Sequence, residues 1–423
     1  MTTHYREKLL SNFAALGIIQ GTNYLLPILV MPFVLKKIGA DGFGEVAVAQ
    51  GVMTYFMTIA DYGFNLTATR DVSNNRNNRN IISKIFCAVL MTRLLVCILL
   101  FLILGVALFL VPYLHTYSLL YLLAFTSVIG QSILMNWLFQ GIEQMKFITY
   151  LTLLARLIFV ILVFVFIRTK ADNIYFIFFT GVGNILAGAV SIIAAVRLLK
   201  LKIVMPSAGE LKEELRKGWH ITVANLAVSS YTNINILLLL LFTNDTAVGY
   251  YSIADKLIMA ARQVLAVYFQ AIYPQVCRLA QNTRQEIIQF FKRYYLPFLG
   301  AIFLGCLVLF IFPQPIAGFF IKGHQSLTAE YLRIMAFVPL IICLNIPFYQ
   351  LLIARNEKKR LMKVFISVTV INVVLNMFLA KAYGAIGTSL VVLITEFLIT
   401  TALIYELAMM SGLRLANIKN DSI

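Results

Sequence analysis

The sequence predicts an all-α integral membrane protein of about 12 transmembrane helices, arranged as two parallel-repeat six-helix lobes around a central cavity. Three observations support this fold class. Hydrophobic residues make up 61% of the 423 residues and charged residues only 13%, and the mean hydropathy is +0.86. A soluble domain cannot bury that much apolar surface. The other two observations are the lengths of the apolar runs and the distribution of Lys and Arg between them.

Long apolar runs recur along the whole chain. A helix needs about 20 mostly apolar residues to cross the hydrocarbon layer. Because these runs are continuously apolar and do not alternate at every second residue, they predict helices and not the strands of a barrel. The expected spans, in order, are residues 11–35, 42–63, 83–111, 117–140, 147–168, 172–196, 218–242, 246–273, 294–321, 328–353, 361–380 and 385–410.

Lys and Arg fall mainly in every second gap between these runs. Three cations at the very ends of spans, Lys84, Arg168 and Lys363, are counted with the adjoining gaps. On that count the two ends of the chain and the even-numbered gaps hold 24 of the 35 cations, the odd-numbered gaps hold 6, and 5 lie deeper inside spans. Cytoplasmic loops carry the excess of Lys and Arg, so both termini are predicted to be cytoplasmic. The net charge of +17 is then explained by basic loops that face an anionic inner leaflet, without nucleic acid as a partner. No cleavage site follows the amino-terminal stretch, so we expect the first span to be retained.

The longest polar gap divides the chain into two halves with six spans each. We expect an N-lobe at 1–200, a cytoplasmic linker at 201–217 and a C-lobe at 218–423. An even number of spans per half makes both halves enter the membrane from the same side, so a repeat would be parallel. Two such lobes would leave a cleft between them, which is the geometry that alternating access requires.

Polar side chains on the first two spans of each half predict a wet interior. On the second span Gln50, Thr54 and Thr58 are spaced four apart, so they form one stripe on an apolar helix. Such a stripe must face protein or water. The residues expected to line the cavity are Gln20, Asn23, Gln50, Thr54, Thr58, Asn225, Ser229, Asn233 and Gln263.

Cations inside the spans are the candidate substrate ligands. A charge at membrane depth costs about 2.5 to 3.5 kcal/mol on insertion scales, so it usually faces a cavity or an opposite charge. Arg262 and Lys256 are the first candidates to bind an anionic head such as a diphosphate, unless Asp255 neutralises one of them. Arg156 and Arg93 are further candidates; alternatively, these two and Glu396 form structural pairs with one another or contact lipid phosphates.

Carboxylates in the spans are the candidates for binding a coupling proton or sodium ion. They are Asp61, Asp255 and Glu396. The four His and five Cys residues are scattered, without a spacing typical of a metal site, a disulfide framework or a nucleophilic triad. We therefore expect no metal, no cofactor and no enzymatic activity.

Several strings resemble a known family. These strings are QGTNYLLPILVMPFVLKKIGADGFGEVAVAQ (20–50), DYGFNLTATRDVSNNR (61–76), NWLFQGIEQMKFIT (136–149) and QAIYPQV (270–276). They are similar to the O-antigen flippases, the Wzx-type branch of the polysaccharide transporters in the multidrug/oligosaccharidyl-lipid/polysaccharide (MOP) exporter superfamily. The resemblance runs the whole length and is only generic in the last third.

The resemblance implies a MATE/MOP-like protein of the bacterial inner membrane. Such a protein carries undecaprenyl-diphosphate-linked O-antigen oligosaccharides from the cytoplasmic to the periplasmic leaflet, and an O-antigen polymerase and a chain-length regulator come into consideration as partners. Two alternatives remain. A multidrug exporter would share the fold but should prefer an acidic pocket, and an O-antigen polymerase would need a larger periplasmic loop than the outer gaps here provide.

Overall fold

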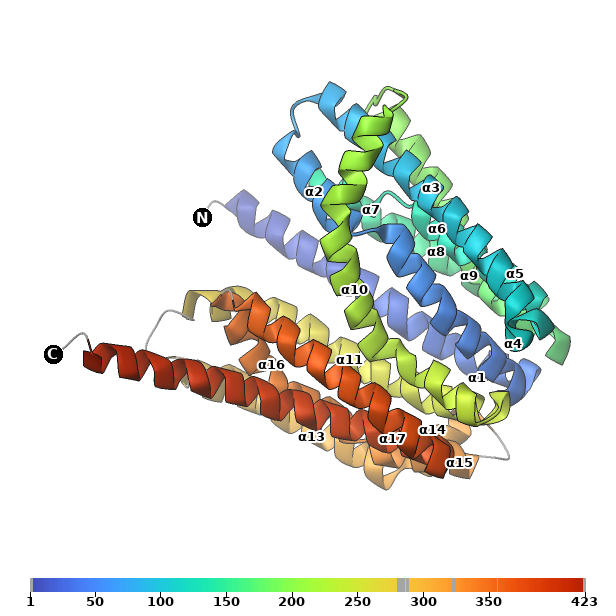
Figure 1. Cartoon of the computed structure of the whole chain (residues 1–423), viewed down its shortest axis with the longest axis vertical. Coiled ribbons are helices and arrows are strands. Elements are labelled where there is room, and N and C mark those ends of the chain that lie inside the picture. Colours follow the sequence, from blue (N-terminus) through green and yellow to red (C-terminus); the bar gives the residue numbers. More distant parts are fainter. Residues whose placement is uncertain (1–2, 280–285, 287–288, 322–324, 356, 421–423) are drawn as a thin grey trace. The chain divides into compact units, whose positions relative to one another are not determined.

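The protein is described by a computed structural model that covers residues 3–279, 286, 289–321, 325–355 and 357–420; within these residues it is built from helices and contains no strand (Figure 1). The chain divides into two compact units, which we call the first unit (Met1–Asn233) and the second unit (Ile234–Ile423).

The first unit begins with a long helix and continues with helices that pack on it. Helix α8 contacts α1 and α9, and α6 contacts α3 and α9. Short breaks at Phe125 and at Leu134–Met135 divide the fourth predicted span into three helices. The helices are α1 (Thr3–Asp61), α2 (Phe64–Asn74), α3 (Arg79–Leu110), α4 (Pro112–Thr116), α5 (Ser118–Ala124), α6 (Thr126–Ile133), α7 (Asn136–Gly141), α8 (Met145–Phe166), η1 (Lys170–Asp172), α9 (Asn173–Leu198) and most of α10 (Ala208–Phe242).

The second unit consists of the end of α10 and the helices that follow it. Helix α11 contacts α15, α16 and α17, and α13 contacts α16. An apolar cluster around Leu265, Phe269, Tyr295 and Cys343 lies in this unit. The remaining helices are α11 (Asp245–Leu279), η2 (Phe291–Tyr295), α13 (Leu296–Ile311), α14 (Pro313–Phe320), α15 (Gln325–Met335), α16 (Val338–Ala354) and α17 (Lys358–Asn420).

Two glycines divide the longest helices at the places where the sequence predicts loops. Gly39 (φ 75°) interrupts α1 and Gly384 (φ 57°) interrupts α17. A positive φ is accessible to Gly at little cost because Gly has no Cβ. The 59 residues of α1 would span about 90 Å as one helix at 1.5 Å per residue, roughly three times the hydrocarbon thickness. Each of the two long helices is therefore long enough for two of the predicted spans.

Many helices are long and apolar enough to cross a membrane. Seven in the described part of the chain meet that condition, and α10, bent by 52° between Ser230 and Thr232, would make eight. Helix α11 is more polar, with Asp255, Lys256 and Arg262 within two turns. The all-helical membrane fold is thus confirmed, whereas the number of 12 spans stays a prediction.

The boundary between the two units lies within α10. Its first half packs on the first unit, where a Cβ at Gly218 would meet the carbonyl of Tyr62 and a Cβ at Gly63 would meet Ile221. The division into a lobe at 1–200, a linker at 201–217 and a lobe at 218–423 remains a prediction about the path of the chain through the membrane.

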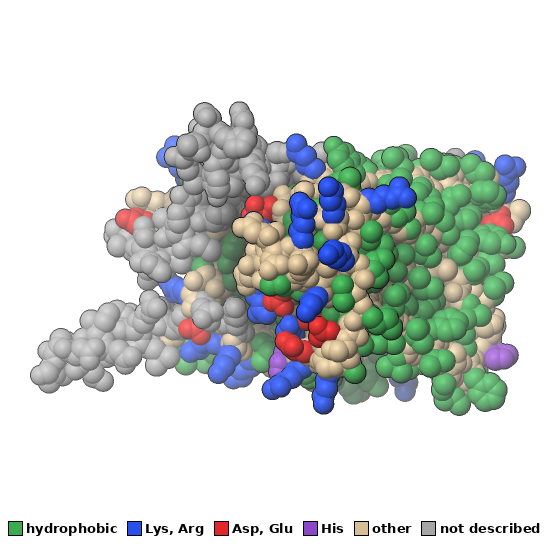
Figure 2. Space-filling model, turned by 90° about the horizontal axis from the view of Figure 1, so that it is seen from above, with side chains coloured by type: hydrophobic (Ala, Val, Ile, Leu, Met, Phe, Trp, Pro, Cys, Tyr) green, Lys and Arg blue, Asp and Glu red, His purple; other side chains and the backbone are tan. Residues whose placement is uncertain are grey.

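Apolar side chains cover much of the outer surface. On α3, for example, Phe109 is 84% exposed and Leu102 is 61% exposed. Exposure of so large an apolar surface to water would be unfavourable. Figure 2 shows a broad surface of hydrophobic side chains, with Lys and Arg side chains gathered beside it. This surface and the apolar helices make the chain a multi-pass membrane protein.

Candidate functional site

Two adjoining cavities lie in the first unit. They share Thr54, Met57 and Gln131. The larger has a volume of about 520 Å³, and the smaller, about 390 Å³. Both volumes fall in the range of small-molecule sites, about 300 to 1,000 Å³.

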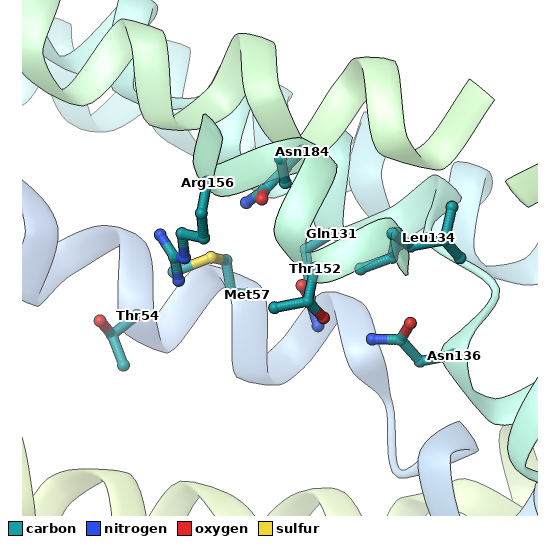
Figure 3. Close-up of a pocket in the computed structure, with 10 residues that line it drawn as sticks. Thr54, Met57, Gln131, Leu134, Asn136, Thr152, Arg156 and Asn184 are labelled. Carbon is teal, nitrogen blue, oxygen red and sulfur yellow. The ribbon is translucent and has the colours of Figure 1, made fainter. Parts of the chain in front are cut away.

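The larger cavity has a polar lining drawn from five segments. Apolar parts of the wall come from Met57, Leu134, Leu151 and Ala155. Figure 3 shows Arg156 extending from α8 toward Met57 on α1, and the amide ends of Gln131 and Asn136 near Thr152. The polar residues of the lining are Thr54, Gln131, Asn136, Thr152, Arg156 and Asn184.

Glycines bring the helices of the cavity wall close together. A Cβ at Gly183 of α9 would collide with the backbone carbonyl of Ala155 on α8, and a Cβ at Gly130 of α6 would collide with Asn184. The close approach of the backbones places Asn184 beside Arg156, which lies one turn after Thr152 on α8. The positions of Asn184 and Arg156 are therefore fixed by helix packing.

The smaller cavity lies between α1 and α10. The hydroxyls of Thr58 on α1 and Ser229 on α10 are 3.1 Å apart and share a hydrogen bond. Thr54 and Thr58 each donate a hydrogen bond to the carbonyl four residues earlier, at 2.8 Å. Asp61 and Asn225 also line this cavity. Four of the residues predicted to line a cavity thus lie together here: Thr54, Thr58, Asn225 and Ser229.

A buried ion pair closes the end of α1 next to this cavity. The side chain of Arg93 on α3, which is 0% exposed, donates to the carboxylate of Asp61 and to the carbonyl of Leu134 at 3.0 Å. Asn65 donates to the same carboxylate at 2.7 Å. Asp61 lines the smaller cavity, whereas Arg93 is not among the lining residues of either cavity. Arg93 thus forms a structural pair with Asp61, whereas the sequence suggested Glu396 as its partner.

A second charged cluster lies in the second unit. Arg262 on α11 forms an ion pair with Glu396 on α17, at 2.9 Å, with side chains that are 19% and 3% exposed. Asp255, on the same helix, interacts electrostatically with both Arg262 and Lys256. The four groups together carry two positive and two negative charges, so the cationic character expected for the eighth span is offset within the cluster.

The other predicted residues are placed as follows. The Asn233 side chain donates a hydrogen bond to the backbone carbonyl of Ser229 at 3.1 Å. The backbone carbonyl of Gln50 accepts a hydrogen bond from the Thr54 hydroxyl. Gln263 is partly buried on α11. The side chains of Gln20 and Asn23 lie outside the described residues. Within the described ranges, no three His, Cys, Asp or Glu side chains gather as metal ligands would.

Sequence reasoning missed two groups of polar residues. Gln131, Asn136 and Asn184 are single amides in mostly apolar runs and form no stripe. Thr152 lies four residues before Arg156, and that helical spacing was a usable signal. The other group links α10 to both parts of α17. Asn376 donates to Asn235 at 2.7 Å and accepts from Thr388 at 3.0 Å, and these side chains are buried.

The sequence and structure are similar to those of known transporters. The family model described as polysaccharide biosynthesis protein matches residues 9–280. Proteins named "Putative O-antigen transporter" from Escherichia coli (strain K12) and Shigella dysenteriae are 27% and 28% identical over 396 residues, covering 93% and 92% of this chain and 95% and 97% of theirs.

Solved structures of two kinds of transporter have the same fold. An inward-facing multidrug resistance MATE family transporter of the MOP superfamily matches with a TM-score of 0.70 and 14% identity, covering 95% of this chain and 99% of that chain. The lipid II flippase MurJ, in an inward closed conformation, matches with a TM-score of 0.72 and 12% identity, covering 94% and 87%. The family resemblance expected from the sequence is confirmed: the chain belongs to the polysaccharide biosynthesis protein family and has the fold of the MOP-superfamily transporters.

Proposed function

We propose that the protein is a flippase of the bacterial inner membrane, not an enzyme. It moves undecaprenyl-diphosphate-linked O-antigen oligosaccharides from the cytoplasmic to the periplasmic leaflet by alternating access, with both termini cytoplasmic. The family, the names of the full-length relatives and the flippase fold support this proposal. The observation that carries it is a polar cavity of the first unit, lined by amides, hydroxyls and Arg156, within a fold of apolar helices. The charged cluster of the second unit adds a polar site in that unit.

The head group needs such sites because its charge and hydroxyls would otherwise face hydrocarbon. A polar group that enters an apolar medium without hydrogen bonds costs several kcal/mol, and an ion costs more. In the first unit, Arg156 and the amides of the cavity lining offer hydrogen bonds that replace those of water. In the second unit, Arg262 and Lys256 offer positive charge to a phosphate. The polyprenyl tail stays in the lipid.

The pairing of Arg262 with Glu396 suggests how transport is coupled to an ion. The guanidinium can bind a phosphate through the same two-pronged geometry that binds a carboxylate. When a diphosphate binds Arg262 in place of Glu396, the buried Glu396 carboxylate loses its partner. Binding of a proton or sodium ion to that carboxylate then compensates its charge. Asp255 is a second coupling carboxylate in the same cluster. Asp61 is a weaker candidate because Arg93 and Asn65 already hold it.

Complementation of a flippase-null Gram-negative strain that makes the cognate O-unit tests this function. The wild type should restore surface O-antigen. Arg262→Ala and Lys256→Ala should reduce it, because the loss of one hydrogen bond to a charged group costs about 1.5 to 3 kcal/mol, or about 10- to 100-fold in head-group binding. The matched control is Lys381→Ala, since Lys381 is exposed and its charge lies outside the cluster.

Protein amounts in the membrane must be equal for this comparison. Arg262→Ala removes the partner of Glu396 and can lower stability, so the double variant Arg262→Gln, Glu396→Gln, which keeps hydrogen-bonding groups at both positions, serves as a second test. We expect the double variant to accumulate normally and fail to restore O-antigen. Failure of the wild type to restore O-antigen would contradict the proposed function, and full activity of all these variants would contradict the role of the cluster.

A further inference from the structure

The larger cavity of the first unit has the chemistry of a carbohydrate site. We propose that it is the subsite that recognises the sugar portion of the substrate, with Arg156 binding an anionic oxygen group on or next to that sugar. This inference rests on the proposed function and assigns a specific role to Gln131, Asn136, Thr152 and Asn184. In this account the first unit selects the oligosaccharide, and the charged cluster of the second unit takes up the coupling ion.

The polar groups of the lining match those of a saccharide. The carboxamides of Gln131, Asn136 and Asn184 each offer two hydrogen-bond donors and an acceptor oxygen. The Thr152 hydroxyl can donate one hydrogen bond and also accept. Sugar hydroxyls also donate and accept, so an amide N–H can donate to a sugar oxygen and an amide oxygen can accept from a sugar hydroxyl. No carboxylate is among the residues that line this cavity, which disfavours a cationic ligand. The apolar side chains of Leu134 and Leu151 provide a surface for the C–H face of a ring.

One acceptor in this lining is without a partner in the described part of the chain. The Asn136 Oδ1 atom is buried and makes no hydrogen bond there. An unsatisfied buried acceptor costs about 1 to 3 kcal/mol. A ligand hydroxyl in the cavity would satisfy it, so this cost falls when the site is filled.

The site is also formed before the ligand arrives. Gly183 against Ala155, and Gly130 against Asn184, hold α9 close to α8 and α6. Ser191 on α9 accepts a hydrogen bond from the backbone N–H of Met135 at 3.2 Å, which fixes the segment just before Asn136. Side chains on packed helices select a ligand more strictly than side chains on loops do.

Arg156 is the cation of this lining. Its planar guanidinium binds carboxylates and phosphates alike. The anionic group can therefore be the carboxylate of an acidic sugar or the diphosphate beside the first sugar, and binding experiments distinguish the two sources.

The test measures binding to the purified full-length protein in lipid nanodiscs. Two probes are used: the oligosaccharide released from the host's lipid-linked O-unit by mild acid, which lacks the diphosphate, and undecaprenyl diphosphate, which lacks sugar. Asn184→Leu and Asn136→Leu should each weaken oligosaccharide binding about tenfold, equivalent to about 1.4 kcal/mol, and leave undecaprenyl diphosphate binding unchanged. Gln140→Leu, an exposed amide of α7 outside the cavity, should change neither.

Arg156→Gln identifies the anionic group. If the variant weakens binding of undecaprenyl diphosphate only, Arg156 binds the diphosphate. If it weakens binding of the oligosaccharide only, Arg156 binds a sugar carboxylate. Either result supports the subsite. The inference is overturned if the wild type does not bind the oligosaccharide, if Asn136 and Asn184 variants bind it as the wild type does, or if Arg156→Gln changes neither affinity. If the wild type restores O-antigen in cells, these outcomes contradict the sugar subsite but not the proposed function. Failure of the subsite and failure of the proposed function are therefore distinguishable.

Discussion

At the scale of the residue, two buried carboxylates of the described chain are each held by an arginine. Asp61 pairs with Arg93 between α1 and α3, and Glu396 pairs with Arg262 between α17 and α11. The sequence drew attention to these charges because each interrupts an apolar run. It could not predict their partners, since pairing depends on which helix faces pack together. Glu396 is the clearest case: it was one of three candidate carboxylates, and only the packing of α17 on α11 places it against Arg262.

The Asp61–Arg93 pair should contribute mainly to stability. Removal of one partner from a buried ion pair typically costs about 3 to 5 kcal/mol because the other charge remains buried. Arg93→Met should therefore lower the thermal unfolding midpoint of the detergent-purified protein strongly. The double variant Asp61→Asn, Arg93→Met should recover part of this loss, because neither charge then remains. A midpoint for Arg93→Met equal to that of the wild type would contradict the structural role.

At the scale of the element, hydropathy predicted where helices lie better than how they are broken. The spans expected at 83–111 and 147–168 correspond to α3 (Arg79–Leu110) and α8 (Met145–Phe166). The span expected at 117–140 is instead divided into α5, α6 and α7. The residues at these breaks are as apolar as their neighbours, so local sequence carried no signal. The breaks position Leu134 and Asn136 on the cavity wall.

The glycine break in α17 gives a prediction at this scale. Gly384 has φ 57° and ψ −133°, a combination that residues with a Cβ adopt only at a cost of about 1 to 3 kcal/mol. Gly384→Ala should lower the thermal midpoint. Gly300→Ala is the matched control, because a Cβ at Gly300 of α13 meets nothing within 4 Å, and Ala favours a helix over Gly by about 1 kcal/mol. Equal midpoints for the two variants would argue against strain at Gly384.

At the scale of the whole molecule, each unit carries a distinct polar site. The first unit holds two cavities lined by amides and hydroxyls; Arg156 lies in the wall of the larger and Asp61 in the wall of the smaller. The second unit holds the four-charge cluster of α11 and α17. The sequence predicted the polar stripes of α1 and α10 from their helical spacing. It missed the amides of Gln131, Asn136 and Asn184 because isolated polar residues in apolar helices have no pattern, and only packing brings them together.

Reconstitution tests the central claim most directly. The purified protein is placed in liposomes with lipid-linked O-units in the outer leaflet, and the fraction of sugar that becomes protected from an added glycosidase is measured with and without a proton or sodium gradient. The proposed function predicts that protection rises in liposomes with the wild type and remains at the protein-free level with the double variant Arg262→Gln, Glu396→Gln. Protection that is the same with the wild type as without protein, under either gradient, would contradict it.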